Sequence, residues 1–186
     1  KMKKRILLSL IISLIYTVGK SQTASVEKST YGIQTGLLGI WVHNEMKLTN
    51  QIALRTEFGV NASIFGGNFY PKTGFLMTPV ISVEPRWYYN LEKRLSKSKS
   101  ISGNSGNFVS LQTSYHPDWF VISNYDNLKT FNLITIIPTW GIKRNIGKHF
   151  TYETSIGVGY GYQFRGEYDD VNGIAIDLNL RIGYRF

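Results

Sequence analysis

The stretch "IAIDLNLRIGYRF", residues 174–186, alternates between apolar and polar side chains along its whole length. Every even position from Ile174 to Phe186 is apolar or aromatic, and the odd positions include Asp177 and Arg181. A period of two residues predicts a β-strand with one apolar and one polar face. In a soluble sheet a second layer would cover the apolar face, whereas in a membrane barrel that face would contact lipid and the charged face would point inward. This stretch alone fits both arrangements.

The same alternation recurs through the chain after residue 22. In "FTYETSIGVGYGYQF", residues 150–164, aromatic and branched side chains oppose a face of glycine and polar residues that includes Glu153. No stretch after residue 22 shows the 3.6-residue apolar stripe of an amphipathic helix. The pattern therefore predicts an all-β domain. Its clear strands are expected at 31–43, 51–64, 75–90, 107–116, 131–143, 149–164 and 173–186.

The first residues carry a different pattern. Lysine and arginine fill residues 1–5 apart from Met2, an apolar run follows at 6–16, and the small residues Gly19 and Ser21 come after it. This order is typical of a secretory signal peptide, and the run is shorter than the ~20 residues that a membrane-spanning helix requires. We expect a signal peptide at residues 1–21 and an exported domain at residues 22–186.

Charge and cysteine content exclude several classes of function. Loss of residues 1–21 would remove five of the 21 Lys and Arg residues and none of the 12 acidic ones, which leaves 16 against 12 and lowers the net charge from +9 to +4. That balance and the lack of a nucleic-acid motif argue against a nucleic-acid partner. The chain has no cysteine, so disulfides, thiolate metal sites and a lipid-modified cysteine are excluded. We expect no cofactor.

Two features favour a membrane barrel over a soluble sandwich. Charged residues and glycines share the polar face well inside the predicted strands, where glycine makes room within a narrow barrel. Aromatic residues lie near strand ends on the apolar face, as they do in the interfacial girdles of membrane barrels. The expected interfacial aromatics are Trp87, Tyr89, Trp140, Tyr160 and Tyr162.

Several stretches carry a family resemblance. "LRIGYRF" at 180–186, "GIWVHNEMKL" at 39–48, "VISVEPRWYYNL" at 80–91 and "IIPTWGIKRNIGKHFTYETSIGVGYGY" at 136–162 resemble small porin-like outer-membrane β-barrels of diderm bacteria, mostly without an assigned activity. The resemblance implies an outer-membrane location, contact with outer-membrane lipids including lipopolysaccharide, and a last strand read by the barrel-assembly machinery. The implied assembly signal is Leu180, Ile182, Tyr184 and Phe186.

An even number of strands is expected of such a barrel, so an eighth strand must join the seven predicted ones. The stretch "DWFVISNY", residues 118–125, is the favoured source, and the basic connection at 91–106 then becomes an extracellular loop. Alternatively, "TASVEKST" at 23–30 supplies the strand, 107–125 is one long strand, and the basic connection faces the periplasm. The predicted fold is a transmembrane, antiparallel, up-and-down β-barrel of eight strands.

A barrel of this size has room inside only for side chains or one small ligand. Charged residues on the inner face must then compensate one another, because an unpaired buried charge is unfavourable. We therefore expect a narrow lumen plugged by a network of charges. Its expected members are Arg55, Glu57, Glu84, Arg86, Glu153, Asp177 and Arg181.

The histidines do not form a convincing catalytic pattern. His149, Thr151 and Glu153 share one face at a spacing of two, but His149 stands at the edge of a tight turn, where a structural role is the better interpretation. His116 is interpreted as a loop anchor, and His43 has no catalytic neighbours in the pattern. We expect no catalytic residues and no metal site. The acidic stretch "GEYDDVNG" at 166–173 is interpreted as a hairpin connection.

The expected function is that of an integral outer-membrane barrel with a structural or surface-interaction role, not that of an enzyme. The alternatives are a lipid-A-modifying barrel enzyme and a narrow porin for small solutes. The basic residues Lys93, Arg94, Lys97 and Lys99 form either a solvated loop or, outside the cell, a contact for lipopolysaccharide phosphates.

Overall fold

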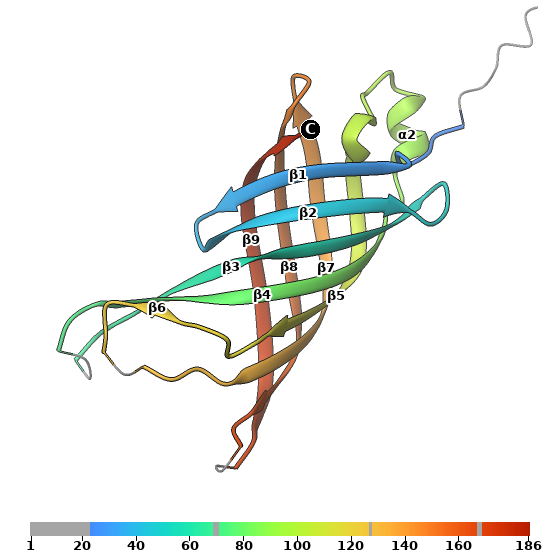
Figure 1. The fold of residues 1–186 in the computed structure, drawn as a ribbon. Coiled ribbons are helices and arrows are strands. Elements are labelled where there is room, and N and C mark those ends of the chain that lie inside the picture. The colour runs from blue at the N-terminus through green and yellow to red at the C-terminus, as the bar shows by residue number, and fades with distance from the viewer. Residues whose placement is uncertain (1–22, 69–70, 127, 167–168) are drawn as a thin grey trace, which may run out of the picture.

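Nine antiparallel strands form one continuous sheet in the computed structural model, which describes residues 23–68, 71–126, 128–166 and 169–186 (Figure 1). The predicted signal peptide lies outside these residues. A short helix, α2 (Leu91–Leu95), and a 3-10 turn, η1 (Ser102–Asn104), lie between two of the strands. The strands are β1 (Ser29–Gly36), β2 (Gly39–Lys47), β3 (Ile52–Phe65), β4 (Gly74–Trp87), β5 (Gly106–His116), β6 (Ile122–Ser123), β7 (Asn132–Ile146), β8 (Phe150–Phe164) and β9 (Val171–Arg185).

Eight of these strands close into a ring. Each pairs with the next ring strand along the chain, and β9 pairs back onto β1 from Gly32↔Arg185 to Gly36↔Arg181. The remaining strand, β6, pairs only with Leu76 and Met77 of β4 and lies outside the ring. Figure 1 shows β1–β4 crossing in front of β7–β9, as tilted strands on opposite sides of a ring do. The all-β class and the up-and-down antiparallel topology are confirmed.

The missing strand comes from an unexpected place. The prediction of one strand at 31–43 was wrong, because the chain reverses at Leu37 and Leu38 and pairs β1 with β2 from Gly36↔Gly39 outward. Gly39 has a positive φ of 149°, a conformation that L side chains rarely adopt. Gly36 and Gly39 are the turn signal here, but the two leucines between them carried the apolar pattern across the tip and hid the turn.

Neither predicted source of the eighth strand was right. Of the stretch at 118–125, only Ile122 and Ser123 are in a strand, and of the stretch at 23–30 only Ser29 and Thr30 belong to β1. The connection at 91–106, expected to be a plain loop, contains α2 and η1. Among the described residues, no helix is both long enough and apolar enough to span a membrane.

The ring has two different ends. The end that we call the terminal end holds the first residue of β1, the last residue of β9, the turns at 48–51 and 147–149, and the connection at 88–105. Figure 1 shows α2 and the C-terminus at this end. The opposite, loop end holds the β1–β2 turn and the described residues of the connections between β3 and β4, between β5 and β7, and between β8 and β9.

The ring is apolar on its outer face and charged on its inner face, the reverse of the usual arrangement in a soluble protein. On the outer face large apolar side chains are exposed, for example Ile176 at 67% and Val158 at 58%. On the inner face Glu153 and Arg55 are each 1% exposed. The hydrophobic core is confined to a small cluster near the terminal end. Its members are Ala24, Val26, Ala53, Tyr88, Leu91 and Phe108.

Candidate functional site

A balanced set of charges fills the ring near its terminal end. Six strands (β2, β3, β4, β7, β8 and β9) contribute four cations and four carboxylates, each at most 5% exposed. The formal charges cancel, so each buried ion has a partner of opposite sign, as burial requires. We call this set the interior charge network. It consists of Arg55, Arg86, Lys143, Arg181, Glu45, Glu57, Glu84 and Glu153.

Glu45 on β2 is the centre of the network. Its carboxylate is 0% exposed, and both oxygens accept several hydrogen bonds. Three cations of the network donate to one oxygen, and two neutral groups donate to the other, so five side chains converge on this one carboxylate. The donors are Lys143 Nζ at 2.8 Å, Arg55 Nη1 and Arg86 Nη1 at 3.2 Å, Tyr88 OH at 3.0 Å and Asn104 Nδ2 at 2.7 Å.

Arg86 on β4 reaches across the ring to Glu153 on β8. Its Nη1 and Nη2 donate to the two oxygens of Glu153 at 3.0 and 2.7 Å, and Nη2 also donates to Glu84 at 2.7 Å. Such a two-pronged pair is the strongest geometry between arginine and a carboxylate. The guanidinium lies 4.2 Å from the ring of Phe108. This arrangement ties opposite walls together and fills the interior at that level.

A second chain of contacts ties β3 to β9. One oxygen of Glu57 accepts from Arg55 Nη2 at 2.6 Å and from Arg181 Nη1 at 2.8 Å. The Arg181 guanidinium stacks 3.9 Å from the ring of Trp41, which points inward from β2. The network therefore extends from the terminal end toward the middle of the ring.

Asp177 is the one predicted lumen residue that does not join an ion pair with the described residues. It is half-buried on β9, four residues before Arg181, and accepts a hydrogen bond from Asn179 Nδ2. Two network members, Glu45 and Lys143, were missed by sequence reasoning. The parity signal was present for both, because Glu45 shares a face with Trp41, and Lys143 shares one with the interior threonines of β7.

The terminal end of the ring is capped. Val26 and Leu91 pack into the small hydrophobic cluster beside the network. Outside this cluster, both oxygens of Glu27 accept from Arg185 Nη1 at 3.0 Å, and Glu27 also accepts from the Gly103 backbone N–H. Residues from both ends of the described chain and from the 88–105 connection thus cover this end of the interior.

Open space lies on the other side of the network. A cavity of about 340 Å³, which we call the interior cavity, is lined by polar groups that include Glu57, Asp177, Ser114 and His116. A second cavity of about 350 Å³ beneath the 117–131 connection shares His116 with it. The hollow part of the ring therefore extends toward the loop end and is blocked toward the terminal end.

The three histidines lie apart. His149 is at the surface, where its ring stacks 5.2 Å from that of Tyr184 and its Nδ1 lies 3.1 Å from the Arg185 carbonyl oxygen. Glu153 is bound to Arg86 inside the ring, so the candidate group of His149, Thr151 and Glu153 is not brought together. The other two line the interior: His116 borders the cavities, and His43 is buried on β2.

The predicted interfacial aromatics form two groups on the outer face. Near the terminal end, Trp140 Nε1 donates to Tyr89 OH at 2.9 Å, and the rings of Tyr89 and Trp87 meet edge to face at 6.1 Å. Tyr160 and Tyr162 lie toward the loop end of β8. The residues of the expected assembly signal are exposed along the outer side of β9 and just beyond it. They are Leu180, Ile182, Tyr184 and Phe186.

The acidic stretch after β8 forms part of a hairpin connection. Asp170 accepts from the Tyr162 hydroxyl at 2.5 Å and from the Arg165 backbone N–H at 2.9 Å. These hydrogen bonds stabilise the carboxylate and lower the pKa of Asp170 below its ordinary value. Glu167 lies outside the described residues. Across the part of the chain that is described, no three His, Asp or Glu side chains are grouped so as to hold a metal ion.

Comparison with known proteins adds nothing to this picture: no family model, no curated protein and no solved structure matches the chain.

Proposed function

We propose that the chain is an integral β-barrel protein of the bacterial outer membrane, with a structural or surface-interaction role and a lumen plugged by the interior charge network. The inverted polarity of the ring carries this proposal. Exposed apolar patches on monomeric soluble proteins seldom exceed a few hundred Å². Here the apolar side chains continue around the outer face while charged ones are buried, an arrangement that hydrocarbon favours and water does not.

The two ends of the ring support an orientation. Membrane barrels of bacteria have short turns on the periplasmic side and longer loops outside. The turns at 48–51 and 147–149 are short and lie at the terminal end, so we place that end in the periplasm. The basic connection at 91–106 lies at the same end. We therefore place it in the periplasm, the alternative position, and not outside the cell. We therefore withdraw the contact between its lysines and lipopolysaccharide phosphates, and we assign contact with outer-membrane lipids to the apolar outer face.

Neither alternative function gains support from a specific contact. The lipid-A-modifying enzyme would use a histidine beside a nucleophile and a carboxylate, and His149 lies away from Glu153. The narrow porin would need a continuous path, and the interior charge network together with the cap lies across it.

Folding in detergent is the first test of the proposal. We expect the protein, extracted from outer membranes, to migrate faster on a gel when unheated than when boiled, because a closed hydrogen-bonded ring resists dodecyl sulfate until heated. It should also float with phospholipid vesicles after a carbonate wash. A protein that shows no shift and stays in the aqueous fraction would contradict the proposal.

Conductance tests the plugged lumen. We expect the purified protein to insert into planar bilayers without stepwise current, since buried ion pairs bridge β4 and β8 across the interior. Insertion is verified in parallel by protease protection in vesicles. Reproducible unit steps from the unmodified protein would instead establish the porin alternative.

A further inference from the structure

The wall of the ring has a notch at the loop end, because β1 and β2 are shorter than their neighbours. On one side, β9 pairs with β1 only from Arg181 to Arg185, so residues 171–180 have no strand on that edge. On the other side, β3 continues past its last β2 partner, Asn61, as far as Phe65. The tip of the β1–β2 turn lies at the base of this notch and accepts one hydrogen bond from Ala62 N–H at Leu38 O.

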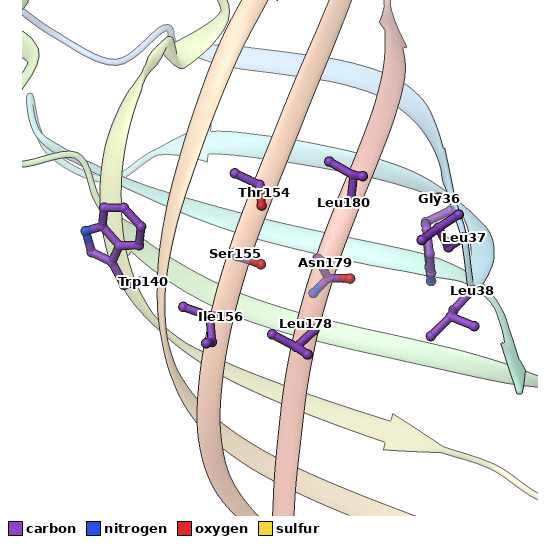
Figure 2. A pocket seen from close by; sticks show the side chains of 11 residues that line it. Gly36, Leu37, Leu38, Trp140, Thr154, Ser155, Ile156, Leu178, Asn179 and Leu180 are labelled. Carbon is purple, nitrogen blue, oxygen red and sulfur yellow. The ribbon is translucent and has the colours of Figure 1, made fainter.

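An apolar groove runs along the outer face beside the notch. It has a volume of about 440 Å³, and we call it the outer groove. Figure 2 shows Leu37 and Leu38 of the turn beside Leu178 and Leu180 of β9, with Ile156 on the neighbouring strand. Its size lies in the range of small-molecule sites, and its walls are mainly hydrocarbon.

The outer groove adjoins the interior cavity, and the two spaces share part of their walls. Four residues, Leu38, Trp41, Leu178 and Asn179, line both spaces. Leu178 faces outward from β9, so its presence in the wall of the interior cavity shows that the cavity reaches the free β9 edge. Beside the turn, the apolar outside and the polar inside are therefore separated only by these shared residues.

Carboxylates outnumber cationic side chains in the wall of the interior cavity, where Glu57 and Asp177 lie with one arginine, Arg181. Asp177 lines the interior cavity and forms no ion pair with the described residues, whereas Arg181 beside it is held by Glu57. Residues 171–180 of β9 have no strand partner on the β1 side among the described residues, and backbone without such a partner is tolerated at membrane depth only where it borders a polar space. Such a site would bind a positively charged group that donates hydrogen bonds.

We propose that the notch admits one membrane lipid with a primary-amine head group, whose acyl chain occupies the outer groove and whose ammonium group binds Asp177 in the interior cavity. The inference rests on the proposed membrane location. The apolar outer groove matches the acyl chain, and the notch matches the part of the lipid that links chain and head group. The carboxylate of Asp177, which forms no ion pair with the described residues, matches the ammonium group.

Photolabelling in vesicles tests this site. The unmodified full chain is inserted into phosphatidylcholine vesicles that contain a trace of phosphatidylethanolamine carrying a diazirine on one acyl chain, and labelled peptides are mapped by mass spectrometry. We expect labelling to concentrate on Ile156, Leu178 and Leu180 rather than on Leu111, which lies on β5 outside the groove. The same diazirine on phosphatidylcholine, which has no N–H donor, should label the groove less.

Two variants separate the head-group site from the groove. Asp177→Asn should lower groove labelling by phosphatidylethanolamine about tenfold, the equivalent of one charge-assisted hydrogen bond, and leave phosphatidylcholine labelling unchanged. Its control is Asp118→Asn in an exposed connection. Leu38→Trp places a larger side chain in the wall that groove and cavity share, and it should lower labelling by both lipids.

The outcomes distinguish this inference from the proposed function. Protein that fails to insert, judged by gel shift and flotation, overturns both. Inserted protein whose labels spread evenly over the outer face, or whose phosphatidylethanolamine labelling is the same in Asp177→Asn, overturns the lipid site alone.

Discussion

Replacing Glu45 with alanine is expected to lower the free energy of unfolding by about 3–5 kcal/mol, the range observed when one partner of a buried ion pair is removed. Glu45 accepts from Lys143, Arg55 and Arg86, and all four side chains are buried. Its loss leaves the interior charge network with four cations and three carboxylates. Reversible urea unfolding in phospholipid vesicles measures the change.

Two further variants give this prediction its control. Glu92→Ala removes an exposed carboxylate on α2 that makes no ion pair with the described residues, and it should leave stability unchanged. Glu45→Gln combined with Lys143→Met restores the balance of charge, so the pair should lose less stability than the sum of the two single variants, by about 0.5–3 kcal/mol. If Glu45→Ala behaves like Glu92→Ala, the network does not hold the ring together.

Replacing Leu111 with arginine is expected to destabilise the protein in a bilayer by about 2–4 kcal/mol, the cost of a cation on the lipid face near the midplane of a barrel. Leu111 is the central residue of β5 and pairs with Pro138 of β7. Its side chain is 45% exposed on the outer face. In water the same substitution would be almost neutral. The measurement therefore distinguishes a lipid-facing surface from a solvated one.

Leu48→Arg is the matched control. Leu48 is exposed to a similar extent, 52%, but stands in the turn at the terminal end, where the cost should fall to about 0–1 kcal/mol. Unfolding in vesicles and in detergent micelles should rank the two variants in the same order. Equal stabilities for Leu111→Arg and Leu48→Arg would exclude a hydrocarbon environment at β5.

Much of the fold followed from residue parity. The strands at 51–64, 107–116, 149–164 and 173–186 were predicted within a few residues, and so was the inward face of all but the second of them. Parity works here because successive side chains of a strand point to opposite faces, whatever the strand pairs with. The interior position of six charged residues, such as Arg55 and Glu153, follows from the same rule.

Parity does not show where an apolar strand reverses or which charges meet. The division at Leu37 and Leu38 was missed because two apolar residues form the tip between Gly36 and Gly39, although this division supplies the eighth strand of the ring. Asp177 and Glu153 share the inner face, yet only Glu153 pairs with an arginine. The difference depends on how far each residue lies from the terminal end of the ring, and this distance is set by strand register.

The amino-acid sequence by itself determined the class of the fold and the polarity of its two faces, because both are local consequences of a two-residue period. Only the tertiary structure decided three other features: the closure of β9 onto β1, the choice of Glu45 as the centre of the network, and the notch beside the short β1–β2 hairpin. Each of these depends on contacts between residues far apart in the chain. Their geometry arises only when all eight ring strands adopt a tilt and a register that are consistent with one another.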